Sequence, residues 1–245
     1  MTSYEQQITY ELTTWQNRIT KPASPANRLA KAVQERINRL FPDKVRQAIT
    51  TAIKQMIRGM LFGAEQLTSQ PATGLSIQER EVQILTRIKH YKRIGAAEGG
   101  VAGAGGFLLA LADFPLLLSL KMKLLFDIAA LYGYSVTDYR ERLFMLHIFQ
   151  LAFSGPRHRQ TVFQRLRDWD AYSRQLPDDI HQFDWQTFQE EYRDYIDLAK
   201  MAQLIPGIGA VVGVLVNYSL IDKLGVTAMN AYRMRWQQTQ LKLQA

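Results

Sequence analysis

The sequence contains no cysteine, and this absence excludes disulfide bonds, thiolate metal sites and a cysteine nucleophile. The first twenty residues lack a basic segment followed by an apolar run, so we expect no export signal. Alternation of apolar and polar residues, which is typical of a half-buried strand, is missing over any useful length. These absences predict an all-α protein in a reducing compartment.

Patterns typical of catalytic and cofactor sites are also missing. The glycine-rich stretch has no strand before it and no GK[ST] sequence, which argues against nucleotide binding. No serine lies in a nucleophile-elbow sequence. The histidines lack the spacing of a zinc site: His90, His147, His158 and His181. We therefore predict no catalytic residue, no metal and no cofactor.

The length and composition are those of one globular helical domain. The chain has 245 residues, of which 47% are hydrophobic and 21% charged. Proline, glycine and serine between residues 69 and 76 mark the one plausible linker. We expect a single domain over 1–245, with basic amphipathic helices in 1–68 and the remaining core in 76–245.

Positive charge is concentrated in the N-terminal part of the chain. Residues 1–98 hold fifteen lysines and arginines against eight acidic residues, whereas residues 99–245 hold fifteen against fourteen. Such a surface suits anionic lipid, although it is also compatible with a merely solvated face. Nucleic acid is a rival partner that we do not favour, because no DNA- or RNA-binding motif is present.

Helical periodicity defines several amphipathic segments. One stripe in residues 1–20 consists of Tyr4, Ile8, Leu12, Trp15 and Ile19. A helix beginning at Asp43 carries Ile49, Ile53, Met56, Ile57 and Met60 on its apolar side. Ser76 and Glu79 have the spacing of a capping box. The helix after them has a predicted apolar stripe of Val82, Leu85, Ile88, Tyr91 and Ile94.

Two glycine-rich apolar stretches, 94–120 and 201–221, are the most unusual feature of the chain. Glycine recurs every fourth residue at Gly95, Gly99 and Gly103, and again at Gly209 and Gly213. This spacing leaves one helix face without side chains, so that two helices can approach closely. We predict a multi-helix bundle around this central pair, either buried or able to enter a bilayer, since spanning requires about 20 residues. A further helix is expected to begin after Gly225.

A few polar residues in or near these stretches are candidates for function. Asp113 lies inside the first apolar stretch, where it either caps the helix that follows or acts as an acid or base with a raised pKa. Asn217 interrupts the second stretch. A third candidate follows Gly155-Pro156, where an anion near a helix N-terminus would meet Arg157, His158 and Arg159. A solvated turn is the alternative there.

Several of these motifs together resemble the EcsC family of bacterial proteins. They are the run GGVAGAGGFLLALADFP, the turn Tyr132-Gly133-Tyr134, the segment 205–213 with Asn217, and Tyr232 followed by Arg233 and Arg235. The family takes its name from a protein encoded beside an ABC transporter, and its biochemical activity is not established. The resemblance therefore implies a membrane-adjacent context and supplies no catalytic residue.

We expect a cytoplasmic protein that associates peripherally with the inner face of the membrane. It would bind anionic lipid or a membrane protein through its basic N-terminal helices and its glycine-rich helices. The alternative is a soluble enzyme or small-ligand binder with Asp113 in a pocket between the glycine-rich helices.

Overall fold

A computed structural model describes residues 2–21, 43–62, 70–104, 114–195 and 210–244. Within these ranges the chain forms nine α-helices, one short 3-10 helix and no strand, so the predicted all-α class is confirmed. The elements are α1 (Ser3–Thr20), α3 (Asp43–Phe62), α4 (Ile77–Ala104), α6 (Phe114–Leu131), α7 (Tyr139–Phe153), α8 (Pro156–Arg167), α9 (Trp169–Ser173), η2 (Ile180–Gln182), α10 (Trp185–Tyr195) and α12 (Ala210–Gln244).

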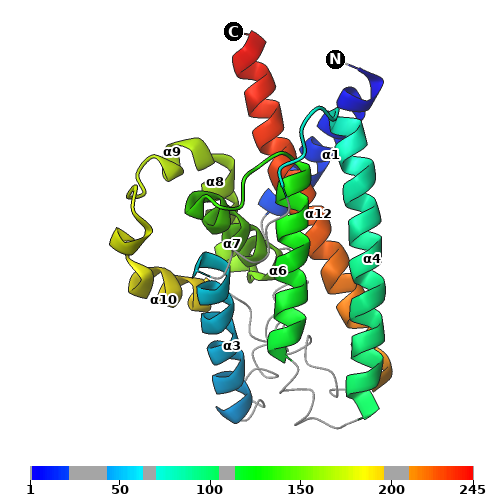
Figure 1. The fold of residues 1–245 in the computed structure, drawn as a ribbon, viewed down its shortest axis with the longest axis vertical. Coiled ribbons are helices and arrows are strands. Elements are labelled where there is room, and N and C mark those ends of the chain that lie inside the picture. Colours follow the sequence, from blue (N-terminus) through cyan, green and yellow to red (C-terminus); the bar gives the residue numbers. More distant parts are fainter. Residues whose placement is uncertain (1, 22–42, 63–69, 105–113, 196–209, 245) are drawn as a thin grey trace.

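The two longest helices, α4 and α12, pack against each other. Helices α4 and α12 run antiparallel side by side, and theirs is the most extensive helix–helix contact among the described elements (Figure 1). Helix α6 lies between α4 and α3, contacting both, and α7 packs behind it. Helix α1 reaches α12, α8 and α4. The N-terminal helix is thereby held against the C-terminal one.

The two N-terminal amphipathic helices bury the faces that their periodicity predicts. In α1 the buried residues are Ile8, Leu12 and Trp15, and the helix starts at a capping box between Thr2 and Glu5. In α3 the buried face includes Ile49, Ile53, Met56, Ile57 and Met60. The segment between these helices, 22–42, lies outside the described residues.

Helix α4 begins as predicted but buries a different face. Ser76 and Glu79 form the capping box, with the Glu79 amide donating to the Ser76 hydroxyl and the Ser76 amide to the Glu79 carboxylate. Val82 and Leu85 are 56% and 54% exposed, so the predicted stripe is wrong in its first half. Glu81 and Ile84 are buried in their place. The cause is an arginine on α12, which draws the Glu81 carboxylate inward.

Gly225 does not end a helix, in contrast to the prediction, because α12 continues unbroken from Ala210 to Gln244. Its absent side chain is needed for packing. A Cβ at this position would lie 2.6 and 2.7 Å from Cδ1 and Cγ1 of Ile88 on α4. The isoleucine of one helix therefore occupies the gap left by the glycine of the other.

At a second close approach of the two helices, the glycine is on α4 and the isoleucine is on α12. Gly95 of α4 is buried, and a Cβ there would collide with the end of the Ile221 side chain on α12. This contact agrees with a helix pair that includes Gly95. The regular glycine repeat is not tested, because the side-chain environments of Gly99, Gly103 and Gly213 are outside the described part and Gly209 falls in an undescribed segment.

We expect Gly225→Ala to destabilise the protein by about 1–3 kcal/mol, because the new methyl group overpacks the contact with Ile88. Gly59→Ala on α3 is the matched control. A Cβ at Gly59 meets nothing within 4 Å, so helix propensity alone should stabilise that variant by up to about 1 kcal/mol. Chemical denaturation measures both. Equal stabilisation of the two variants would contradict the close approach of α4 and α12.

Candidate functional site

The Tyr132-Gly133-Tyr134 turn ends α6 and opens the most polar part of the interior. Gly133 has φ +90°, and the amides of Gly133 and Tyr134 donate to the carbonyls of Ala130 and Ala129, which is a Schellman arrangement. The glycine also leaves room for Arg80, whose Nη1 lies 2.7 Å from where a Cβ would be and donates to the Leu131 carbonyl at 3.0 Å. The turn is thus fixed to the start of α4.

Beside this turn, Arg233 of α12 and Glu81 of α4 form a buried bidentate ion pair. The Nε and Nη2 atoms of Arg233 donate to the two Glu81 oxygens at 2.8 and 2.6 Å. The same carboxylate accepts hydrogen bonds from the hydroxyls of Tyr4 at 2.8 Å and Tyr132 at 2.9 Å. Nη1 of Arg233 donates to Glu11 of α1 at 2.9 Å. Every oxygen lone-pair direction of Glu81 is therefore used inside the protein.

A second buried ion pair involves Arg235, which lies two residues after Arg233 on α12. Arg235 donates to Glu141 of α7 at 2.7 Å, and the Tyr232 hydroxyl donates to the other oxygen of Glu141 at 2.6 Å. The guanidinium of Arg235 also lies 3.8 Å from the ring centroid of Tyr134 and 4.6 Å from that of Phe144. We call these two ion pairs and their tyrosines the arginine–tyrosine cluster.

Burial keeps the hydroxyls of this cluster protonated. It raises the pKa of Tyr132 and of Tyr232 well above 10, and the neighbouring carboxylates Glu81 and Glu141 act in the same direction. Burial also raises the pKa of Glu141, although Arg235 partly opposes this. No side chain of the cluster is arranged as an activated nucleophile or base. The chemistry of the cluster is that of a polar scaffold.

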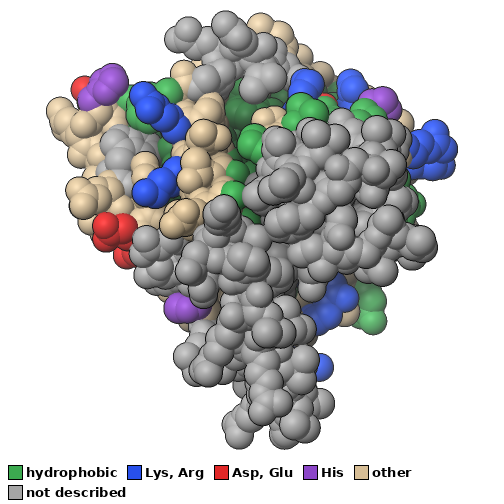
Figure 2. All heavy atoms as spheres, turned by 90° about the horizontal axis from the view of Figure 1, so that it is seen from below, with side chains coloured by type: hydrophobic (Ala, Val, Ile, Leu, Met, Phe, Trp, Pro, Cys, Tyr) green, Lys and Arg blue, Asp and Glu red, His purple; other side chains and the backbone are tan. Residues whose placement is uncertain are grey.

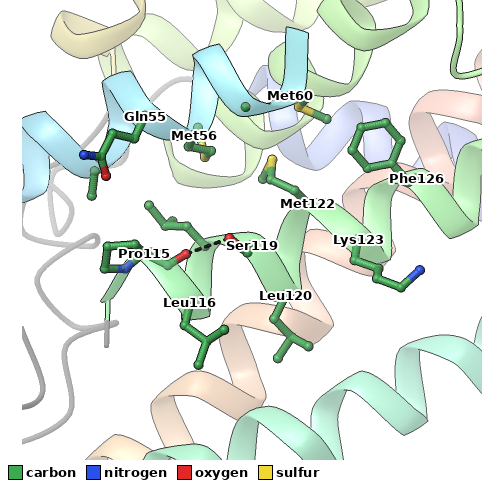
Figure 3. A pocket seen from close by; sticks show the side chains of 13 residues that line it. Gln55, Met56, Met60, Pro115, Leu116, Ser119, Leu120, Met122, Lys123 and Phe126 are labelled. Atoms are coloured by element: carbon green, nitrogen blue, oxygen red, sulfur yellow. Dashed lines mark hydrogen bonds between the residues drawn. The ribbon is translucent and has the colours of Figure 1, made fainter. Parts of the chain in front are cut away.

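Two cavities open beside these elements. One, of about 510 Å³, has a wall that is polar and apolar in about equal parts; Arg80, Tyr132, Tyr134 and Trp236 contribute to it. The other, of about 540 Å³, is an apolar groove between α3 and α6. Figure 3 shows Met56 and Met60 on α3 facing Met122 on α6 across this groove. Within the described part of the chain, no group of three potential metal-binding side chains was found.

The candidates predicted from the sequence are not brought together in the described part of the structure. Asp113 lies in an undescribed segment, so neither its capping role nor a catalytic role is tested. Asn217 is part of α12, but its surroundings are not described. His158 and Arg159 lie half-buried in the first turn of α8, while the side chain of Arg157 is outside the described part. The predicted anion site is therefore not tested.

Comparison with known proteins assigns the chain to a family. The model of the EcsC protein family matches residues 6–236. The chain belongs to the EcsC protein family. It is 38% identical over 231 residues to protein EcsC of Bacillus subtilis, a match covering 94% of this chain and 95% of the relative. It is 30% identical over 148 residues to uncharacterized protein YdbA of the same organism, covering 60% and 54% of the two chains. No solved structure matches.

The arginine–tyrosine cluster contains several of the sequence motifs that resemble the EcsC family. The turn at 132–134 and the residues Tyr232, Arg233 and Arg235 are the motifs that suggested the EcsC family from the sequence, and the structure places them in contact. Tyr132 and Tyr232 stack at 5.1 Å between ring centroids. The carboxylates Glu81 and Glu141 were missed, because each lies in the sequence among residues of amphipathic helices with nothing to mark it as buried.

A buried histidine was also missed. His147 of α7 is fully buried, and its Nδ1 lies 3.1 Å from the Gln150 side-chain oxygen, while its Nε2 has no hydrogen-bond partner. The rings of Trp169, Tyr172 and Phe188 surround it edge-on. Burial lowers the pKa of His147 from 6.5 to about 4, and the positive charge of nearby Arg165 acts in the same direction.

Replacing Arg233 with Met should destabilise the protein by about 3–5 kcal/mol, because it leaves the Glu81 carboxylate buried without its counter-charge. The double variant Glu81→Leu/Arg233→Met should be less destabilised than the single one. Arg167→Met breaks an exposed pair with Asp168 and should cost less than about 1 kcal/mol. Chemical denaturation measures all three. An Arg233→Met cost as small as that of Arg167→Met would show that the buried pair is unimportant.

The protein should lose stability in acid through His147. Its folded-state pKa is below its unfolded-state pKa, so the unfolded chain binds more protons and stability falls as the pH drops from about 6.5 to 4. A shift of this size corresponds to about 3 kcal/mol. His147→Asn removes the titration, and the difference in melting temperature between variant and wild type should change with pH over this interval. A constant difference would refute the assignment.

Proposed function

We propose that the protein associates peripherally with membranes, binding anionic lipid through the basic surface of its N-terminal helices. The observation that carries this proposal is the state of its positive charges. Seven exposed lysines and arginines of this part of the chain have no ion-pair partner among the described residues: Arg18, Lys21, Lys54, Arg58, Arg87, Lys89 and Arg93. They are available to an external anion.

Cations of the C-terminal part are used differently. Seven of them form ion pairs: Lys123 with Asp127, Arg140 with Asp178, Arg165 with Glu191, Arg167 with Asp168, Arg233 with Glu81, Arg235 with Glu141 and Lys242 with Asp170. An ion pair cancels much of the field that an approaching phosphate would feel. Among the described residues, most of the exposed cations without an ion pair therefore lie in the N-terminal part of the chain.

Five of the seven unpaired cations lie on α3 and α4, the two helices that flank α6. Lys54 and Arg58 belong to α3 and Arg87, Lys89 and Arg93 to α4, and both helices contact α6 (Figure 1). Figure 2, which views the molecule from below, shows several separate lysine and arginine side chains on this face. Val82 and Leu85 add exposed apolar surface on α4. Apolar and basic side chains together are typical of helices that contact a lipid surface.

Contact from one side is consistent with the helices observed. No described helix is both long and apolar enough to cross a bilayer. The name of the family's relatives specifies no lipid, so the lipid class is proposed from charge alone. A membrane protein with an acidic surface is the partner that the same charges would also attract.

Flotation with vesicles tests this proposal. The wild type should float with phosphatidylglycerol vesicles at low salt and remain behind with phosphatidylcholine vesicles. The triple variant Arg87→Gln/Lys89→Gln/Arg93→Gln should bind about a hundredfold more weakly, because each cation near an anionic surface contributes about 1 kcal/mol. The control removes three paired cations, by Arg140→Gln/Arg167→Gln/Lys242→Gln, with the same change in net charge. Equal effects of the two triple variants, or wild type that never floats, would refute the proposal.

A further inference from the structure

The apolar groove between α3 and α6 has the lining of a binding site for a chain-like apolar ligand. Its volume of about 540 Å³ lies within the range of about 300–1,000 Å³ typical of small-molecule sites. The lining of α6 from Pro115 to Phe126 extends over roughly 17 Å at the helical rise of 1.5 Å per residue. This length accommodates most of a fatty acyl chain.

The walls of the groove are adaptable and mostly apolar, and Gln55, Ser119 and Lys123 are the polar side chains of the lining. Methionine enters from both helices, as Met56 and Met60 on α3 and Met122 on α6, and the flexible thioether side chain adjusts to ligands of varied shape. The Ser119 hydroxyl already donates to the Pro115 carbonyl at 2.9 Å. A peptide would bring backbone amides and carbonyls that find few partners here, at a cost in free energy. A hydrocarbon chain brings none.

One charged side chain, Lys123, belongs to the lining. It is 45% exposed and lies 3.6 Å from Asp127, whose carboxylate also accepts a hydrogen bond from the Tyr91 hydroxyl at 2.8 Å. The ion pair with Asp127 therefore involves the lysine ammonium itself, and it leaves the lysine side chain partly exposed to solvent. In Figure 3 its side chain points away from the methionines. An anionic headgroup at the end of an apolar chain matches this arrangement of charge.

We propose that this groove binds one acyl chain of an anionic phospholipid, with the headgroup phosphate at Lys123. This inference rests on the proposed membrane association. It adds that, when the protein is at the membrane, a single acyl chain of one lipid lies in the groove between α3 and α6. The surface cations recognise the lipid surface, whereas the groove recognises one molecule of it.

Monomeric lysophosphatidylglycerol, used below its micelle concentration, is the probe, because it carries one acyl chain and needs no vesicle surface. Binding is measured by titration calorimetry. Gly59 offers a way to fill the groove, since it belongs to the lining and its missing Cβ faces open space. Gly59→Trp should weaken binding at least tenfold, while Gly59→Ala should leave it unchanged. Ser119→Trp fills the groove from α6 and replaces the first variant if that variant fails to fold.

The contribution of the Lys123 charge and the chemical class of the lipid ligand are tested separately. Lys123→Gln should weaken lysophosphatidylglycerol binding about fivefold and leave the binding of a neutral monoacylglycerol, which has no phosphate, unchanged. Absence of binding by the wild type, or unchanged binding by a folded tryptophan variant, overturns the groove proposal. Tighter binding of palmitate than of lysophosphatidylglycerol overturns the assignment to a phospholipid. Failure of vesicle flotation with intact monomer binding would instead refute the membrane proposal alone, since the monomer test involves no vesicle.

Discussion

The antiparallel contact between α4 and α12 is the constraint on which the rest of the structure depends. Each helix presents an isoleucine to a glycine of the other, Ile88 to Gly225 and Ile221 to Gly95, so that the register of the pair is set by shape. A shift along the helices would place a side chain against a backbone that cannot accept it. In this register Glu81 of α4 meets Arg233 of α12.

The ion pairs that this register creates link distant parts of the chain. Burying two charges is costly, and a hydrophobic pair of the same size is often equally stable, so their presence is better explained by specificity than by stability. Through Glu81 and Arg233 the cluster also holds α1, by Tyr4 and Glu11. The N-terminal helix therefore docks in one position only, because any other would leave hydrogen-bonding groups buried without partners.

The sequence predicts those features that depend on local pattern. The buried faces of α1 and α3 are predicted correctly because each helix has an apolar stripe on one side and polar residues on the other. The capping box at Ser76 is also predicted correctly, because it depends on two residues that are only three positions apart. The predicted buried face of α4 is partly wrong because Glu81 is buried through its ion pair with Arg233, and these two residues are 152 positions apart in the sequence. The family motifs indicated the arginines and tyrosines of the cluster but not their carboxylates. The groove has no signal in the sequence, because it is a property of two helices together.

The buried ion pairs and the exposed cations of this protein respond differently to dissolved salt. The paired arginines at the centre are shielded from solvent, whereas the unpaired cations of α3 and α4 are exposed. Dissolved salt screens exposed charges over roughly 8–10 Å and affects buried pairs much less. Under the proposed membrane association, a change in ionic conditions or in membrane charge would therefore alter attachment while the register of α4 and α12 is retained. The groove lies between α3 and α6, and in the proposed binding mode an anionic surface that attracts the exposed cations of α3 would bring its lipids to the groove.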